Sequence, residues 1–464
     1  MRIKLKDNYK LGIIDNVNYI LSTNGYKCAF LNKQAAVFLI VLFQCDDIYS
    51  ETDKLAKIFN LNKALLDNAI RQLLKKLDEY IEYTEEQPAI LYDENYLKKV
   101  FDTSNNHEHL IEKESKPRKI KFYLTDYCNR RCVYCFAGAK QIEGMAAPEE
   151  FSFLSVSRFE EVIKEANELR VESIEIAGGD PFVIKNIDEY VKVMVNCFDF
   201  DWSISTKSYV SAETVEKLKK AGLRKIQISI DAFDKNTVDT LLCSEGAYEE
   251  ILETIDNFQK AGIEVVTKAV ITAINIEKIP AYFEKAMELG IKEIRATYYY
   301  ASAGRHSDRL YPSNKQFRVL NERMHPILES LNKHGIYTDF YYHKMSEKVE
   351  GDERIYCGGF TSSMSVRYDG RVLFCDSLNH TDDFAVGNLK EQGIMEVWNS
   401  EESNNMGNPD YFHERFKGTE CYECNLYHNC FYRRCFVRTK NTYGTFYEKD
   451  PACIKRDGDY YDRS

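Results

Sequence analysis

The segment TDYCNRRCVYCFAG, residues 125–138, places Cys128, Cys132 and Cys135 close together in the chain. It follows directly on KIKFYLT, residues 119–125, whose pattern predicts a β-strand. A closed zinc site needs four ligands, and no fourth candidate lies beside these three cysteines. The segment therefore predicts a loop at the end of a strand that holds a metal group with one open position.

After residue 119 the chain alternates between strand patterns and helix patterns. Six strand–helix units in series predict a parallel sheet with helices outside it, in an open sheet or a partial barrel. In both architectures ligands bind at the carboxyl ends of the strands. The expected strands cover residues 119–125, 171–181, 202–208, 224–232, 264–272 and 292–301, and the expected helices cover 156–170, 212–223, 247–262 and 279–290.

Short polar motifs follow the first four predicted strands. After the cysteine loop come the run GGDP, residues 178–181, then Ser205 with Thr206, and then Ser229 with Asp231. Taken alone, a Gly-Gly pair indicates a turn, and an Asp at a strand end often caps a helix. Because the carboxyl ends of parallel strands share one edge, the four groups together predict a single binding site.

The spacing Cys-x3-Cys-x2-Cys, with Tyr134 before the last cysteine, resembles the signature of the radical SAM superfamily, and GGDP resembles its Gly-Gly-Glu-Pro motif. The resemblance implies a partial (β/α)6 TIM-like barrel. In it, Cys128, Cys132 and Cys135 would hold a 4Fe–4S cluster, whose open iron S-adenosylmethionine chelates through its amino and carboxylate groups. Asp180 stands where Glu is usual, but the family role of the motif belongs mainly to the backbone. On the residues alone, a zinc site short of one ligand is the alternative. The implied cofactor contacts are Tyr134, Gly178, Gly179, Asp180, Pro181, Ser205, Ser229 and Asp231.

The resemblance also implies the type of reaction. In the superfamily, one electron from the cluster cleaves S-adenosylmethionine, and the 5′-deoxyadenosyl radical abstracts a hydrogen atom from the substrate. The cofactor carries the difficult chemistry, while the protein positions it and excludes water. The chain is thus expected to be a radical SAM oxidoreductase with flavodoxin or ferredoxin as electron donor. The sequence assigns no catalytic acid or base.

Seven more cysteines follow residue 350. SMSVRYDGRVLFC, residues 363–375, predicts a hairpin that turns at Asp369-Gly370 and brings Cys375 near Cys357. The cysteine spacing resembles the SPASM domain, except that four residues precede Cys435 where three are usual. Two zinc knuckles are the alternative on the residues alone. The resemblance implies two auxiliary 4Fe–4S clusters, one held by Cys421, Cys424, Cys430 and Cys453 and the other by Cys357, Cys375 and Cys435 with an open iron or a ligand from elsewhere.

Residues 1–95 predict a separate, winged-helix-like α+β domain. Helix patterns follow Asn32 and cover residues 50–60 and 62–80. Their spacing resembles the PqqD-like leader-recognition element, which implies that a leader peptide adds as a strand to the small sheet. A DNA-binding winged helix is the alternative. Beyond this domain we expect a linker at 96–118, the radical SAM core at 119–310, a helical bridge at 311–350 and the SPASM domain at 351–464.

Composition limits the partners and the compartment. A net charge of −11 argues against nucleic acid or an anionic membrane as the main partner. No apolar run approaches the roughly 20 residues of a membrane helix. The start, MRIKLKDNYK, has no export signal, so we expect a cytoplasmic protein. Fourteen cysteines in a reducing compartment favour metal or redox roles over disulfides.

Together the resemblances imply a radical SAM/SPASM peptide maturase, similar to sactipeptide and ranthipeptide synthases. It would bind a ribosomally made precursor by its leader and form thioether bonds from cysteine sulfur to carbon in the core peptide. A carbon–carbon crosslinking or epimerising maturase is one alternative. A sulfatase-type maturase that makes formylglycine is another. Outside enzymes, the alternative is a zinc-binding winged-helix regulator.

Overall fold

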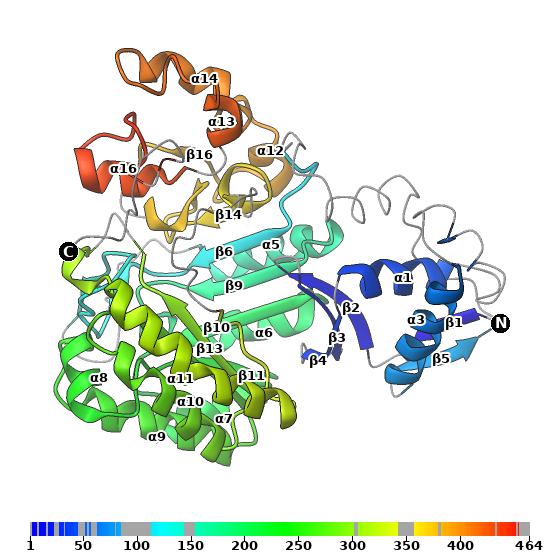
Figure 1. Cartoon of the computed structure of the whole chain (residues 1–464). Helices are drawn as coiled ribbons and strands as arrows, with labels where there is room; N and C mark the ends of the chain where they lie inside the picture. The colour runs from blue at the N-terminus through cyan, green and yellow to red at the C-terminus, as the bar shows by residue number, and fades with distance from the viewer. Residues whose placement is uncertain are drawn as a thin grey trace. The chain divides into compact units, whose positions relative to one another are not determined.

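The chain forms two units, residues 1–110 with 199–201 and residues 111–198 with 202–464 (Figure 1). Among the residues that the structure describes, no helix is long and apolar enough to cross a membrane. The computed structural model describes residues 2–6, 9–14, 17–22, 27–31, 33–44, 52, 55–56, 63–78, 80–84, 113–142, 154–300, 305–341, 357–378, 382–431, 434–451 and 453.

The described residues of the first unit include the helices α1 and α3 and two small antiparallel sheets. β1 (Arg2–Leu5) pairs with β5 (Ile81–Thr84), and α1 (Lys33–Gln44) and α3 (Lys63–Lys76) pack with them around one apolar core. In α3 the buried residues recur at helical spacing, which gives the helix one apolar face. The second sheet has the order β2 (Tyr9–Ile14), β3 (Val17–Ser22) and β4 (Lys27–Leu31).

The first and third predicted helices of this unit are confirmed. The expected helix at 50–60 lies largely outside the described residues, although Thr52, Leu55 and Ala56 are helical. The resemblance implied a small sheet in this unit, but no strands were assigned to residues 9–31, because they carry little alternation between apolar and polar residues. The winged-helix arrangement itself stays a prediction.

A nine-stranded sheet organises the second unit. Its order is β13-β12-β11-β10-β9-β6-β14-β15-β16. The first six positions hold the predicted strands, and the pairs β6–β9, β10–β11, β11–β12 and β12–β13 are parallel, as expected for a partial barrel. These strands are β6 (Lys119–Tyr123), β9 (Ser173–Ala177), β10 (Asp201–Thr206), β11 (Lys225–Ser229), β12 (Glu264–Ile271) and β13 (Glu293–Tyr298).

Helices alternate with these strands along the chain (Figure 1). Two of them, α6 and α8, were not predicted. The sequence of α6 contains VKVMV, whose β-branched residues also fit a strand, and α8 has only eight residues. The helices are α5 (Val156–Glu168), α6 (Ile187–Cys197), α7 (Ala212–Lys220), α8 (Lys235–Leu242), α9 (Ala247–Lys260), α10 (Ile279–Glu288) and α11 (Asn314–Lys333).

The two faces of the parallel strands differ in chemistry. On the face toward the helices, Phe122 packs edge-on against Phe159 of α5 with ring centroids 5.2 Å apart, and Thr267 bonds to Tyr282 of α10. Because neighbouring side chains of a strand point to opposite faces, the alternate residues lie on the other side. We call that side the inner face. Its charged residues include Lys121, Glu175, Lys225, Lys268, Glu293 and Arg295.

The predicted hairpin is confirmed, and it extends the same sheet. β14 (Ser363–Val366) and β15 (Arg371–Leu373) pair antiparallel around a turn in which Gly370 has a φ of 84°. β14 also pairs in parallel with β6, and β16 (Ala385–Asn388) completes the edge. Sequence patterns did not predict the pairing of β14 with β6, because its partners are distant in the chain.

An aromatic core supports the rest of the C-terminal segment. Phe384, Phe412, Phe416, Phe431 and Phe436 are buried together, and five of the cysteines pack against them. The short helices around this core are α12 (Ile394–Trp398), α13 (Glu401–Met406), α14 (Pro409–His413), α15 (Tyr427–Phe431) and α16 (Phe436–Tyr443).

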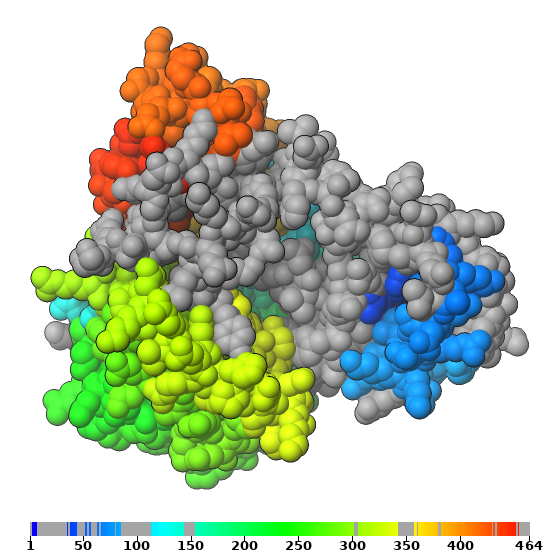
Figure 2. Space-filling view, viewed as in Figure 1, coloured from blue at the N-terminus to red at the C-terminus, as the bar shows by residue number. Residues whose placement is uncertain are grey.

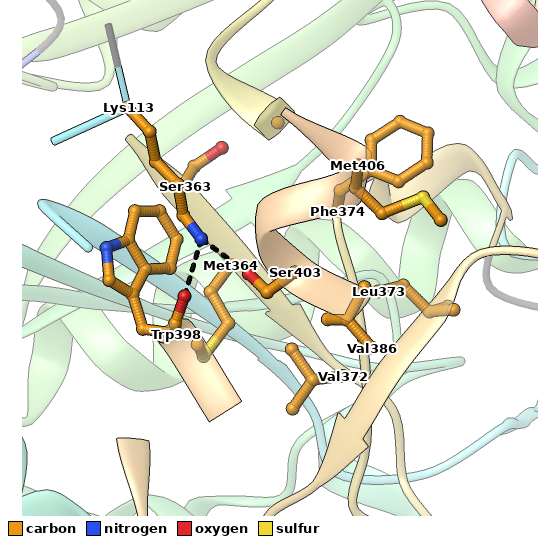
Figure 3. Close-up of a pocket in the computed structure, with 11 residues that line it drawn as sticks. Lys113, Ser363, Met364, Val372, Leu373, Phe374, Val386, Trp398, Ser403 and Met406 are labelled. Atoms are coloured by element: carbon orange, nitrogen blue, oxygen red, sulfur yellow. Dashed lines mark hydrogen bonds between the residues drawn. The ribbon is translucent and has the colours of Figure 1, made fainter. Parts of the chain in front are cut away.

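Lys113, near the end of the predicted linker, fastens the chain before β6 to the C-terminal helices. Its Nζ donates to the carbonyl oxygen of Trp398, to Ser403 Oγ (2.8 Å) and to Asn404 Oδ1 (3.0 Å). Figure 3 shows the ammonium reaching toward a pocket whose walls are largely apolar and include Met364. With a volume of about 20 Å³, this pocket has room for about one water molecule.

Replacement of Lys113 by methionine is expected to lower the free energy of unfolding by about 1–3 kcal/mol near neutral pH, because three acceptors lose their donor. The variant also changes how the free energy of unfolding depends on pH. Burial lowers the pKa of Lys113 from 10.5 to about 8. Between these values the unfolded wild-type chain binds more protons than the native one, so wild-type stability rises with pH.

Melting temperatures near pH 7 and near pH 9.5 test this, with the exposed Lys285→Met variant as control. We expect the gap between wild type and Lys113→Met to widen at the higher pH. A gap that stays constant across this range would contradict the role assigned to burial of Lys113.

Candidate cofactor and cluster sites

The cysteine loop leaves the carboxyl end of β6, as predicted. Cys128 and Cys132 are buried and Cys135 is half-buried. The loop closes through the pair β7 (Tyr127–Cys128) and β8 (Lys140–Gln141). Burial raises the pKa of Cys132 to about 12. Burial also raises the pKa of Cys128, and the charges of the neighbouring cysteines act in the same direction. Binding of a metal group would therefore displace protons from these thiols.

Arg130 anchors the first half of this loop. Its buried guanidinium donates to the carbonyl oxygen of Lys207 (3.1 Å) and to Ser244 Oγ (2.9 Å), and it forms an ion pair with Glu250. The adjacent backbone N–H of Arg131 donates to the last turn of α8 at 3.1 Å. Sequence reasoning missed Arg130, although an arginine between two cysteines of a metal loop was a possible signal.

Arg305 anchors the second half. Its backbone N–H donates to the carbonyl oxygen of Cys135 (2.8 Å), and its guanidinium donates to those of Cys132 (3.3 Å) and Ala139 (3.2 Å). Sequence analysis did not place Arg305 in the site. The two arginines hold the cysteine loop from opposite ends of the parallel sheet, since Arg305 follows β13 and Arg130 follows β6.

Gly178 and Gly179 lie directly against the backbone of the cysteine loop. The N–H of Gly179 donates to the carbonyl oxygen of Thr125 (2.6 Å), and the N–H of Asp180 donates to that of Tyr127 (2.8 Å). A Cβ on Gly179 would lie 2.0 Å from the Tyr127 carbonyl oxygen, so only glycine fits. The structure thus brings together the cysteine loop and the GGDP run, which the sequence placed at one edge.

Asp180 uses its side chain within the protein. The buried carboxylate accepts hydrogen bonds from Thr206 Oγ1 (2.9 Å) and from the backbone N–H groups of Lys207 (2.8 Å) and Phe182 (3.0 Å). Burial raises the pKa of Asp180, while these donors oppose that shift. The carboxylate therefore ties the ends of β9 and β10 together. Pro181, which follows it, is buried at the start of a short 3-10 turn.

Tyr134, Lys207 and Asp231 form a buried polar cluster beside the cysteine loop. Asp231 Oδ2 accepts from the Tyr134 hydroxyl and from Lys207 Nζ (2.9 Å), and Oδ1 accepts from the N–H of Val270 (2.9 Å). The Lys207 ammonium lies 4.6 Å from the centroid of the Tyr134 ring. Protein groups therefore already occupy both oxygens of Asp231, which fixes the aromatic ring against the sheet.

Ser205 and Ser229 behave differently from Asp231. Both are half-buried at the ends of β10 and β11. Neither hydroxyl has a hydrogen-bond partner among the residues that the structure describes. These two side chains are thus available to a ligand at the predicted edge, and their contact with a cofactor stays a prediction.

The C-terminal cysteines form two groups in space. Burial raises the pKa of Cys375, and the charges of Asp376, Cys357 and Cys435 act in the same direction, so Cys357, Cys375 and Cys435 lie within electrostatic range of one another. Cys421, Cys430 and Cys453 form the second group, since Cys453 raises the pKa of both Cys421 and Cys430 and Cys421 raises that of Cys430. Cys424 also acts on Cys421. These groups have the members of the two predicted sets, and the assignment of each set to one cluster stays a prediction.

Arg434 lies within the second group. Its guanidinium is buried and sits 4.2 Å from the centroid of the Phe416 ring. Its Nε has no hydrogen-bond partner among the described residues. The positive charge lowers the pKa of Cys421 and Cys430 against the effect of burial. A buried N–H donor without an acceptor, next to several thiols, fits a bound anionic group with sulfur acceptors.

Comparison with known families identifies two domains. Residues 122–289 match the profile of the radical SAM superfamily, and residues 357–425 match that of SPASM, an iron–sulfur cluster-binding domain. The AdoMet-dependent heme synthase of Methanosarcina barkeri is 26% identical over 75% of this chain and 99% of its own length. The PqqA peptide cyclase of Gluconobacter oxydans is 26% identical over 61% of this chain and 77% of its own.

Solved structures share the fold. Streptococcus suis SuiB bound to S-adenosylmethionine superposes with a TM-score of 0.57 at 18% identity, over 97% of this chain and 99% of SuiB. SuiB bound to its precursor peptide SuiA gives a TM-score of 0.54 at 16% identity, over 96% and 98%. The enzyme anSMEcpe with bound AdoMet gives 0.50 at 14% identity, over 74% of this chain and 93% of that protein.

The chain is therefore an enzyme of the radical SAM superfamily with a SPASM domain. The radical SAM domain binds S-adenosylmethionine and a 4Fe–4S cluster, and the SPASM domain binds auxiliary iron–sulfur clusters. The residues present fit these groups. The twelve cysteines whose side chains the structure describes are free thiols, and the cysteines with metal-binding spacing occur in three stretches of the sequence. In the described part of the chain, no three His, Cys, Asp or Glu side chains are arranged to hold a single metal ion.

Replacement of Gly179 by alanine is expected to abolish binding of S-adenosylmethionine and to lower the iron content by one cluster. The added Cβ collides with the Tyr127 carbonyl group and displaces the cysteine loop. Iron analysis and equilibrium dialysis of reconstituted protein measure both effects. Gly262→Ala is the control for an alanine that strains the backbone without a collision, because Gly262 has a φ of 75° and a Cβ there meets nothing within 4 Å. Full iron content and unchanged cofactor affinity in Gly179→Ala would refute the argument.

Replacement of Arg434 by methionine is expected to lower the reduction potential of one auxiliary cluster, because a positive charge beside it favours the reduced, more negative form. Redox titration followed by electron paramagnetic resonance measures the potential. Arg434→Lys is expected to restore part of it, and the partly exposed Arg415→Met to leave it unchanged. A purely structural role of Arg434 predicts loss of iron with no shift in the remaining signal.

Proposed function

We propose that this radical SAM enzyme is a peptide maturase, which binds a ribosomally made precursor peptide and modifies its core. One observation carries the proposal. The likeness to SuiB extends over 97% of this chain, including the N-terminal unit, and SuiB has been solved with a precursor peptide. The PqqA peptide cyclase, whose name also states a peptide substrate, adds support at the level of sequence.

Each group of cysteines receives one cluster in this proposal. Cys128, Cys132 and Cys135 bind the cluster that meets S-adenosylmethionine, which supplies on reduction a radical able to remove hydrogen from the substrate. The backbone of Gly178–Pro181, together with Tyr134, Ser205, Ser229 and Asp231, surrounds the cofactor. Arg130 and Arg305 keep the loop rigid. The proposed auxiliary sets are Cys357, Cys375 and Cys435, and Cys421, Cys424, Cys430 and Cys453.

The N-terminal unit, residues 1–95, is proposed to bind the leader of the precursor. A groove of about 450 Å³ lies beside α3 and is lined by Asp67, Arg71 and Tyr83, with Tyr83 at the end of β5. Figure 2 shows the surface of α3 and β5 on the side turned to the viewer. A leader that pairs with a strand of this unit would place alternate side chains in such a groove.

We infer a thioether as the product. The set of Cys357, Cys375 and Cys435 offers three thiolates where a 4Fe–4S cluster has four irons, so one position is open to the thiolate of a substrate cysteine. Carbon–carbon crosslinking and epimerisation are the alternatives within peptide maturases. Flavodoxin or ferredoxin as electron donor and a cytoplasmic location complete the proposal.

Three other functions have less support. The heme synthase relative aligns over its whole length, but a quarter of this chain has no counterpart in it, which favours an additional task such as leader binding. The sulfatase-type alternative is less favoured, because anSMEcpe covers 74% of this chain against 97% for SuiB. The zinc-binding regulator is set aside, because the chain is a radical SAM enzyme.

The test is anaerobic reconstitution followed by incubation with S-adenosylmethionine, a reductant and a precursor encoded beside this gene. We expect the precursor to lose two hydrogen atoms per crosslink, and a precursor with Ser in place of Cys to remain unmodified. Mass spectrometry of the two precursors measures both outcomes. Modification of cysteine-free precursors would overturn the thioether, and turnover of a porphyrin but of no peptide would overturn the peptide maturase.

The variant Arg71→Glu separates leader binding from chemistry. It reverses a charge in the groove beside α3, so we expect weaker precursor binding in fluorescence anisotropy and unchanged formation of 5′-deoxyadenosine without peptide. Lys164→Glu, on the exposed side of α5, is the matched control. Equal precursor affinity in Arg71→Glu and wild type would exclude this groove as the leader site.

A further inference from the structure

The inner face of the parallel strands carries a lysine whose side chain has no ion-pair or hydrogen-bond partner within the described ranges. Lys268 lies in β12, opposite Ser229 of β11 and Arg295 of β13 in the strand register. It is half-buried, and its neighbour Thr267 points to the helix side, where it meets Tyr282. The Lys268 side chain therefore projects from the inner face of the sheet.

The other cations of this face are paired. Lys121 meets Glu175 (3.2 Å) and Asp376 (3.1 Å), and both Lys225 and Arg295 form ion pairs with Glu293. The Lys268 side chain, by contrast, makes no ion pair and no hydrogen bond with the residues that the structure describes. The carboxylates named here are thus already paired with other cations, and Lys268 has no carboxylate partner among the described residues.

The charges around Lys268 do not offset the effect of burial on its pKa. Burial lowers its pKa, and this is the largest effect. Glu175 and Asp339 act in the opposite direction from a distance, while Arg295 and Lys121 add to the lowering. A half-buried ammonium without a counter-charge gains when an anionic ligand supplies one.

A second group on the inner face is also unsatisfied. Tyr123, the last residue of β6, is 1% exposed, and its hydroxyl has no hydrogen-bond partner among the described residues. Its ring lies 6.1 Å from that of Phe136 in the cysteine loop. Lys121 links the two groups: its ammonium lies 5.5 Å from the centroid of the Tyr123 ring and pairs with Glu175 (3.2 Å), whose charge also acts on the pKa of Lys268. A buried hydroxyl without a partner is rare in proteins and points to a missing ligand.

We propose that the inner face binds a carboxylate of the substrate, with Lys268 as its counter-charge and the Tyr123 hydroxyl as a second donor. This rests on the proposed function: the carboxylate belongs to an acidic side chain of the peptide held near the cysteine loop. A carboxylate has two oxygens and accepts from both an ammonium and a hydroxyl. The α-carboxylate of S-adenosylmethionine is a weaker candidate, because the family resemblance assigns it to the cluster.

The test uses the full chain with reconstituted clusters and two blocked amino acids, N-acetyl-glutamate N-methylamide and its glutamine analogue. We expect the glutamate probe to raise the melting temperature of the wild type, because a ligand that binds the native state stabilises it. The glutamine probe is expected to have no effect. Lys268→Met is expected to weaken glutamate binding by about tenfold or more, and Tyr123→Phe to weaken it less.

Two controls separate ligand binding from structural damage. Without probe, Lys268→Met is expected to melt no lower than the wild type, because it removes an unpaired charge, whereas Lys121→Met loses two ion pairs and melts lower. Should Lys268→Met fail to fold, Lys268→Gln and Tyr123→Phe give the same comparison, since the Tyr123 hydroxyl makes no bond in the described structure.

Other outcomes overturn the proposal. Equal probe shifts in wild type and Lys268→Met exclude Lys268 as the counter-charge. A loss of S-adenosylmethionine affinity in Lys268→Met without any probe effect assigns the carboxylate to the cofactor instead. None of these measurements needs a precursor, so a chain that binds the glutamate probe but modifies no peptide refutes the proposed function and leaves this site standing.

Discussion

The backbone contact between the Gly178–Gly179 turn and the cysteine loop is the constraint on which the cofactor site depends. β6 and β9 pair in register up to Tyr123 and Ala177, so their chains leave the sheet side by side. The N–H groups of Gly179 and Asp180 then continue the pairing past the strand ends, at 2.6 and 2.8 Å. A side chain at Gly179 would separate the two loops. Asp180 carries the same contact onward to β10, so three strand ends are fixed as one rim.

β6 also joins the two cluster-binding parts of the enzyme. It pairs with β9 on one side and with β14 on the other, so the SPASM hairpin is part of the barrel sheet. The carboxyl end of β6 supplies the cysteine loop, whereas the hairpin beside it leads into Cys375. Asp376, the next residue, forms an ion pair with Lys121 at the centre of β6 (3.1 Å). The spacing between the cofactor site and the nearer auxiliary set is therefore set by one strand and not by a flexible linker.

Local pattern and a single topological rule predicted much of this molecule. Strand and helix periods gave the six parallel strands, and the rule that strand ends share an edge placed the cysteine loop beside GGDP. The rest depends on residues distant in sequence. No local pattern in the sequence indicates the β14–β6 pairing or the hydrogen bond from Arg305 to the Cys132 carbonyl oxygen. The same holds for the lack of a side-chain partner for Lys268 among the described residues. Asp231 shows the same limit, because its position was expected but its partners Tyr134 and Lys207 were not.

The chemistry of the inner face differs from that of a closed barrel. A closed eight-stranded barrel fills its interior with layers of branched apolar side chains, which pack against one another across the axis. Here the corresponding positions hold Lys121, Glu175, Lys268 and Arg295. Such groups require ion pairs or water, and burial of several of them in a closed interior is costly. An open sheet keeps these side chains accessible to a polar ligand. Because Lys121 and Arg295 are already in ion pairs, Lys268 is the one of these described cations that can bind a further anion.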